Sequence, residues 1–277
     1  MTNFVANHIN ATAEDLKGNN GIGRYILLPG SDGRAKEIAA SFNALEVKTH
    51  PRGHHLYLGT INDGDKEIAV ATISTGMGCA SMEIILHELF QLGATRFLRV
   101  GTAGSLQPDY IKNCDIINVQ AAVRDEETTV DYAPLTLPAT ASFEFVSAIN
   151  QAANQLGIAN DVKMGTVHCK SSLYAREFGV GPRAEENKAY LALLTRCGVL
   201  ASEMETSALF IQTQYYNHQL MQQAHNAKYR VICGAVLLIV GTSPTQAATT
   251  QEGLAVKKMT ELAFEAIKIL AKQSDIS

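Results

Sequence analysis

Two glycine-containing segments of the chain combine residue types that can hold an anion. The first, LPGSDGR at 28–34, follows an apolar run and precedes a helical pattern. Its glycines allow backbone N–H groups to approach an anion, the helix start adds positive potential, and Arg34 supplies a fork of donors. A plain strand-to-helix turn with a surface arginine has the same pattern, so this segment alone indicates little.

The second segment, STGMGCAS at 74–81, nearly fits the G-x-G-x-x-G pattern of dinucleotide-binding proteins. That function needs an acidic residue at the end of the next strand, where it holds a ribose hydroxyl. The next apolar run carries Arg99 instead, and an arginine in a buried strand is costly unless it meets an anion. The two segments and Arg99 therefore indicate a site for free phosphate. The alternative is that Arg99 pairs with an internal carboxylate.

Two carboxylates, Glu203 and Glu205, flank Met204 where a short strand-like run at 199–201 meets a helical pattern. A carboxylate can accept hydrogen bonds from both hydroxyls of a ribose, and a methionine can lie along a sugar or a base. The alternative is a capped helix start with exposed acidic side chains, which is the commoner use of such residues.

Apolar runs of strand length alternate with helical patterns along the chain. We expect strands at 25–28, 68–73, 97–100, 115–119, 162–167 and 230–240. We expect helices at 35–42, 81–92, 143–156, 184–196, 205–217 and 254–272. The alternation predicts one α/β domain over 1–277, with a central mixed β-sheet flanked by helices and a ligand site at the carboxyl ends of its strands.

Composition excludes several function classes. The net charge is −4, and Lys and Arg are scattered, which argues against a nucleic-acid or membrane-surface partner. The five cysteines form no C-x-x-C pair, and no histidine has metal-ligand spacing, so we expect reduced thiols and no metal site. With no leader pattern at 1–20 and no apolar run long enough to span a bilayer, we expect a cytoplasmic protein.

In order along the chain, these segments resemble the nucleoside phosphorylase-I family and, within it, the uridine phosphorylases. The likeness extends from His8 to the C-terminal helical pattern, and its most specific parts are FLRVGTAGSLQP at 97–108, AVRD at 122–125 and EMET at 203–206. The run GTVHCK at 165–170 looks like the version found in Gram-positive uridine phosphorylases. The resemblance implies a phosphorylase/hydrolase-like three-layer fold and a pentosyltransferase that uses inorganic phosphate as co-substrate, without a metal or redox cofactor.

The resemblance also implies residue roles. The phosphate-binding positions are Gly30, Arg34, Arg52, Arg99 and Thr102, of which Arg52 matches an arginine that reaches the phosphate of a neighbouring subunit. The ribose-binding positions are His8, Met204 and Glu205. His8 precedes DLKG at 15–18 and matches a histidine that is lent across a dimer interface to the ribose 5′-hydroxyl. Family members are hexamers built as trimers of dimers, so the resemblance implies at least a homodimer.

The base-binding positions that the resemblance implies are Ala103, Gly104, Leu173 and Arg176. Uridine phosphorylases have Phe-Tyr-x-Gln-x-Arg where this chain has LYAREF at 173–178, so Leu173 replaces the aromatic residue and Arg176 stands near the glutamine. Purine phosphorylases carry an aspartate in the segment that here is IVGTSP at 239–244, which has neither that aspartate nor the arginine of the uridine enzymes.

The predicted mechanism uses Arg99, Glu205 and Arg176 as catalytic residues. Phosphate held by arginines attacks the anomeric carbon, Glu205 holds the sugar, and Arg176 activates the leaving base. Cleavage of uridine in nucleoside catabolism and pyrimidine salvage is the first hypothesis. A purine nucleoside phosphorylase, a nucleosidase that uses water, and a catalytically weak nucleoside-binding paralogue are the alternatives.

Overall fold

The computed structural model of the chain describes residues 4–223, 230–240 and 250–276. Its strands are β1 (Tyr25–Leu28), β2 (Asn43–Lys48), β3 (Leu56–Asp63), β4 (Lys66–Ile73), β5 (Arg96–Ser105), β6 (Ile116–Asp125), β7 (Ala139–Thr140), β8 (Val162–Lys170), β9 (Ala201–Glu203) and β10 (Ile232–Ile239). Its α-helices are α1 (Asp32–Ala39), α2 (Cys79–Gln91), α3 (Phe143–Gln155), α4 (Ala184–Arg196), α5 (Thr206–Gln223) and α6 (Thr250–Ile276).

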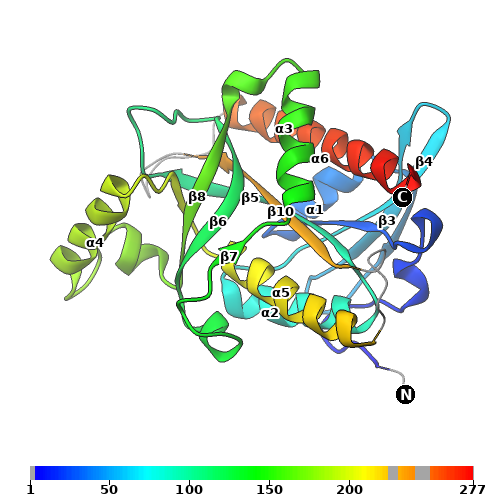
Figure 1. Cartoon of the computed structure of the whole chain (residues 1–277), viewed down its shortest axis with the longest axis horizontal. Coiled ribbons are helices and arrows are strands. Elements are labelled where there is room, and N and C mark those ends of the chain that lie inside the picture. The colour runs from blue at the N-terminus through cyan, green and yellow to red at the C-terminus, as the bar shows by residue number, and fades with distance from the viewer. Residues whose placement is uncertain (1–3, 224–229, 241–249, 277) are drawn as a thin grey trace.

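All of these strands belong to one mixed sheet, in the order β10-β6-β8-β9-β5-β1-β4-β3-β2, with β7 paired to β6. Strand β10 also pairs with β5, so the part of the sheet from β10 to β5 closes on itself. Helices α2 and α5 pack side by side below the sheet in Figure 1, and α3 and α6 pack together above it. The predicted α/β fold with a central mixed sheet flanked by helices is therefore confirmed.

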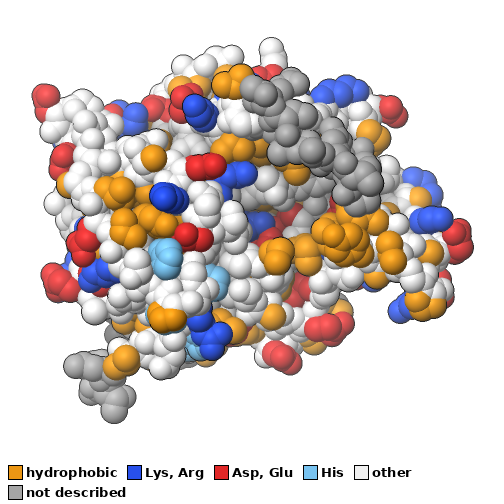
Figure 2. All heavy atoms as spheres, turned by 180° about the vertical axis from the view of Figure 1, so that it is seen from behind, with side chains coloured by type: hydrophobic (Ala, Val, Ile, Leu, Met, Phe, Trp, Pro, Cys, Tyr) orange, Lys and Arg blue, Asp and Glu red, His pale blue; other side chains and the backbone are white. Residues whose placement is uncertain are grey.

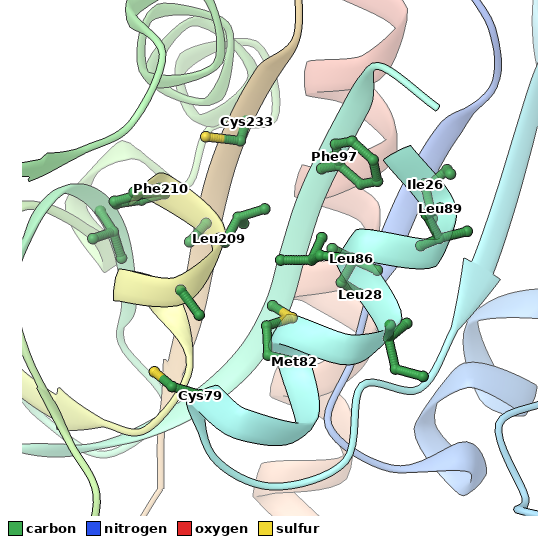
Figure 3. Close-up of a cluster of buried hydrophobic side chains, with 14 of the residues drawn as sticks. Ile26, Leu28, Cys79, Met82, Leu86, Leu89, Phe97, Leu209, Phe210 and Cys233 are labelled. Atoms are coloured by element: carbon green, nitrogen blue, oxygen red, sulfur yellow. The ribbon is translucent and has the colours of Figure 1, made fainter. Parts of the chain in front are cut away.

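Alternation of apolar side chains along the strands produces two cores, one on each side of the sheet. In β1, Ile26 and Leu28 face the α2–α5 core, which Figure 3 shows together with Leu86 and Phe210. Tyr25, next to Ile26, faces the opposite core against α6. Because successive side chains of a strand point to opposite faces, a strand with both faces covered is apolar throughout, as β1 is.

The expected elements correspond closely to the observed ones. The strand at 25–28 and the helix at 184–196 have the expected bounds, and the others differ mainly at their ends. The sequence analysis missed β2, β3 and the two-residue β7. Strand β2 is exposed along most of its length and its apolar residues do not alternate regularly, and Gly59 interrupts β3. A Cβ at Gly59 would lie 2.7 Å from atoms of Phe42 and Asn43, so this glycine allows the close approach of the preceding segment.

One residue of the AVRD motif at 122–125, Arg124, stabilises the fold. Arg124 is buried, and its guanidinium donates to four carbonyl oxygens of the following loop, those of Thr129 (2.7 Å), Ala133 (2.7 Å), Pro134 (2.5 Å) and Leu137 (2.9 Å). It also donates to the Thr129 hydroxyl at 3.0 Å. One side chain therefore holds the loop at 129–137 against the end of β6.

Replacing Arg124 with alanine is expected to lower the free energy of unfolding by about 3 kcal/mol, because the loop loses the hydrogen bonds from a buried charged donor. Urea denaturation followed by circular dichroism measures the change. The control is Arg183→Ala, which removes an ion pair between exposed side chains and is expected to cost less than about 0.5 kcal/mol. Equal losses in the two variants would contradict the role of Arg124 in holding the loop.

Candidate active site

A cavity of about 420 Å³ opens at the carboxyl ends of β1, β5 and β8, within the size range of small-molecule sites. It is lined by Gly30, Ser31, Arg34, Gly76, Met77, Arg99, Val100, Gly101, Thr102, Ala103, Gly104, Lys170, Leu173, Glu177, Phe178, Ser202, Glu203, Met204, Glu205 and Val240. Figure 2 shows a hollow in which basic and acidic side chains lie next to a band of hydrophobic ones. The cavity thus gathers residues from all three segments that the sequence analysis connected with phosphate and ribose.

One end of the cavity carries the groups suited to an anion. Ser31 caps α1, since its hydroxyl accepts a hydrogen bond from the backbone N–H of Arg34 at 3.3 Å. The Arg34 side chain is half-buried, and among the described residues its one ion pair, at 3.4 Å, is with Glu37 in the next turn of the helix. Gly30 and Thr102 line the same cavity. This end therefore combines a helix start with a guanidinium that is weakly engaged.

Arg99 is buried and contacts two carboxylates. Its Nε donates to Glu203 at 3.1 Å, and its Nη2 forms a short ion pair with Glu205. Arg99 therefore pairs with internal carboxylates, as in the alternative given above. It also lines the cavity. Its third nitrogen, Nη1, is buried without a hydrogen-bond partner among the described residues. Gly101 makes room for the guanidinium, because a Cβ there would lie 2.8 Å from Nη2.

The acidic side chains at the start of α5 are buried. The alternative of a capped helix start with exposed acidic side chains is therefore wrong. Burial alone would raise the pKa of Glu203, but the charge of Arg99 and the backbone N–H groups of Glu205 and Thr206 bring it below its usual value. Those N–H groups lie 2.9 Å from the Glu203 carboxylate, so Glu203 caps the helix and anchors Arg99. Its primary role is to hold other groups in place.

Glu205 has a different environment. One of its oxygens accepts from the backbone N–H of Gly78 at 2.6 Å, and the other contacts Arg99. Burial raises the pKa of Glu205, the charge of Arg99 acts against the rise, and the charge of Glu203 adds to it, so the pKa lies above that of an ordinary glutamate. Glu205 therefore connects the glycine segment at 74–81 with the buried arginine.

Lys170 and Glu177 line the cavity and were absent from the sequence-based set of site residues. Lys170 is buried at the end of β8, where its ammonium donates to the Ser202 hydroxyl at 2.9 Å and pairs with Glu177. A Cβ at Gly104 would lie 2.5 Å from a Glu177 oxygen, so Glu177 lies directly over that glycine. The signal that could have found Lys170 is a charged residue in a strand with buried neighbours, the same kind of signal that singled out Arg99.

Arg176 does not line the cavity. Its guanidinium contacts Asp125 at 2.7 and 2.9 Å, donates to Asn187 at 2.7 Å, and lies 4.5 Å from the centre of the Tyr190 ring. The turn Leu173–Glu177 is a π-helical turn in which Glu177 faces the cavity and Arg176 faces α4. Activation of the leaving base by Arg176 therefore has no geometric support in this structure.

His8 and Arg52 also lie outside the cavity of their own chain. The ring of His8 contacts the buried Glu88 at 2.7 Å, and Glu88 also accepts from the backbone N–H groups of Asn7, His8 and Ile9. Arg52 is exposed in the turn between β2 and β3. In the segment 239–244, Val240 lines the cavity, and residues 241–244 lie outside the described part of the chain.

Comparisons with known proteins point to one family. The family model described as the phosphorylase superfamily matches residues 24–267. A uridine phosphorylase of Treponema pallidum is 34% identical over 271 residues, which cover 96% of this chain and 94% of the relative. A uridine phosphorylase of Haemophilus influenzae is 34% identical over 73% of this chain and 78% of its own length. A DeoD-type purine nucleoside phosphorylase of Thermoanaerobacter is 31% identical over 84% and 88%.

Within the described residues, no helix is both long and apolar enough to cross a membrane.

Proposed function

The chain belongs to the phosphorylase superfamily, and from that premise we propose that it cleaves uridine with inorganic phosphate to give uracil and ribose 1-phosphate. One observation carries the proposal: a single cavity brings Gly30, Arg34, Arg99 and Thr102 together with Met204 and Glu205. A nucleosidase, which uses water, gains nothing from two guanidinium groups at one end of its site.

Arg34 and Arg99 support a phosphate site at the end of the cavity next to α1. Arg34 has one ion pair at 3.4 Å, and Nη1 of Arg99 has no partner among the described residues, so both have donors to offer. Glu203 holds Nε of Arg99, which orients the guanidinium before phosphate binds. The cost of burying a phosphate dianion is thereby offset by cations that are already in place.

Glu205 and Met204 support a ribose site beside the phosphate. An oxygen of the phosphate attacks the anomeric carbon, the glycosidic C–N bond breaks, and its electron pair leaves with the base. Positive charge develops on the ribose in between, and both the phosphate and the Glu205 carboxylate stabilise it. The proton that the hydrogen phosphate gives up leaves on the free base, so the reaction is balanced.

Lys170 and Glu177 support a base site at the end of the cavity that Leu173 and Phe178 also line. As the C–N bond lengthens, negative charge spreads onto the carbonyl oxygens of a uracil, and the Lys170 ammonium can donate to one of them. Glu177 can accept from the ring N–H that lies between those carbonyls. An adjacent donor and acceptor fit uracil, and Lys170 takes the role that the sequence analysis gave to Arg176.

His8 and Arg52 support the proposal that the enzyme is a homo-oligomer, at least a dimer and on the family pattern a hexamer. Both residues lie outside the cavity of their own chain, so a contribution to a site must be to that of a neighbouring subunit. We place the enzyme in the cytoplasm and in nucleoside catabolism and pyrimidine salvage. Arginine and lysine supply the positive charge that catalysis needs, so the proposal includes no metal or redox cofactor.

The purified protein is expected to release uracil from uridine only when phosphate is present, with ribose 1-phosphate formed in equal amount. A panel of uridine, thymidine, inosine and adenosine, assayed by chromatography with and without phosphate, measures this. Release of base without phosphate would contradict the phosphorylase mechanism. Faster phosphorolysis of inosine or adenosine would favour the purine alternative, and no turnover of any nucleoside would favour a non-catalytic binding protein.

A further inference from the structure

A row of polar side chains behind the cavity connects Lys170 to the half-buried Asp125. The ring of His168 lies between them, with Nε2 at 2.8 Å from an Asp125 oxygen and Nδ1 at 3.1 Å from the Ser202 hydroxyl. The same hydroxyl oxygen is 2.9 Å from the Lys170 ammonium. Neither Asp125 nor His168 lines the cavity, so the proposed function leaves both unexplained.

Strand register brings these groups to one face of the sheet. Asp125 of β6 is opposite Lys170 of β8, and His168 is opposite Ser202 of β9. His168 and Lys170 are two residues apart in one strand, so their side chains point to the same face. The row thus depends on three strands that are distant in sequence, and it lies on the face away from the α2–α5 core, to which Val167 and Cys169 belong.

The row is almost completely buried, although Lys170 and Ser202 line the cavity. His168 has no exposed surface, and Ser202 and Lys170 are 1% exposed, whereas the Asp125 side chain is 16% exposed. A buried polar group without a partner is costly, and here every group of the row has one.

The hydrogen bonds of the row have one consistent direction. Burial acts to raise the pKa of Asp125, but the hydrogen bond from His168 and the charge of Arg176 hold it below its usual value, so Asp125 is an acceptor. Nε2 of His168 therefore donates to Asp125, and Nδ1 accepts from Ser202. The Ser202 hydroxyl then has its lone pairs directed at Lys170. Each group donates to the next, from Lys170 through Ser202 and His168 to Asp125.

We infer that Asp125, His168 and Ser202 are positioning residues that hold the Lys170 ammonium in place to donate to the leaving base. The inference rests on the proposed function, because Lys170 acts on the base in that reaction. Ser202 and the Glu203 carbonyl, at 3.4 Å, fix Lys170 from the protein side, so only the Glu177 contact has to change when a base enters.

The test compares Ser202→Ala with and without Lys170→Met in uridine phosphorolysis. Ser202→Ala is expected to lower kcat about tenfold, the effect of one hydrogen bond to a charged group, with the KM for phosphate changed less than about twofold. In the Lys170→Met background, Ser202→Ala is expected to change kcat less than about twofold, because its effect passes through Lys170. Equal effects in both backgrounds would overturn the inference.

A second variant tests the part of His168. Glutamine at position 168 can accept from Ser202 and donate to Asp125, so His168→Gln is expected to keep most of the activity. His168→Leu is expected to match Ser202→Ala, and Ser105→Ala, which removes a hydroxyl bonded only to backbone, is the control. Equal activities of His168→Gln and His168→Leu would overturn the inference even if Ser202→Ala fails to fold. A wild type without turnover would overturn the proposed function as well, so the two failures are distinguishable.

Discussion

Arg99→Ala is expected to reduce kcat/KM for phosphorolysis by about a thousandfold or more, with a large part of the loss in the apparent affinity for phosphate. The reason is that Arg99 is the buried cation of the cavity that connects the phosphate end with Glu205. Its loss also leaves Glu203 and Glu205 buried side by side without the arginine that pairs with both. Steady-state kinetics over a range of phosphate concentrations measures the effect.

A second measurement on the same variant separates binding from stability. Two buried carboxylates without their arginine are costly, so the melting temperature of Arg99→Ala is also expected to fall, and to fall further as pH rises and both acids ionise. Arg99→Lys keeps the charge but loses the fork of donors, so it is expected to retain the stability better than the activity. An unchanged phosphate KM and rate in a folded Arg99→Ala would contradict the placement of the anion site.

Glu205→Gln is expected to lower kcat by about a hundredfold or more while the KM for phosphate changes little. An amide oxygen can still accept from Gly78, but it has no negative charge to stabilise a cationic ribose. Because the pKa of Glu205 lies above that of an ordinary glutamate, the wild-type carboxylate takes up a proton early as pH falls, and wild-type activity declines with it. The glutamine variant is expected to lack that part of the acid decline.

The control for this variant is Glu185→Gln on α4, which removes the same charge from an exposed side chain. It is expected to match the wild type in rate and in pH profile. A Glu205→Gln enzyme that keeps its rate but loses affinity for phosphate would show that Glu205 serves Arg99 and not the ribose.

Local sequence predicted much of the fold, and the parts that it missed can be explained from particular residues and strand pairings. Strand β1 is apolar at every position, because both its faces are covered, and its bounds were predicted to the residue. Strand β5 was expected to end at Val100 but continues to Ser105 through Gly101 and Gly104. Glycine weakens a strand signal, and this extension is held by pairing with β10 and β9, which no local pattern reveals.

The sequence predicted some residues of the candidate site correctly and misplaced others. Arg34 and Glu205 were found because they follow apolar runs near the starts of helical patterns, and Arg99 was found because it stands inside an apolar run. The cavity contains all three. Arg176 and Glu177 are adjacent, and a sequence cannot say which of two neighbours in a turn faces a cavity. Asp125 and Asn187 hold Arg176 on the other side, so Glu177 is the residue that meets Lys170.

The sequence by itself determined the order of strands and helices, the glycine segments that precede two helices, and the presence of buried charge at their ends. These follow from interactions between residues a few positions apart: side-chain periodicity, helix capping and glycine conformation. Only the tertiary structure decided which charge meets which. Arg99 pairs with Glu203 across 104 positions and Lys170 with Ser202 across 32, and such pairs depend on strand register and sheet closure, because a charge removed from water is stabilised only by the partner that the fold brings to it.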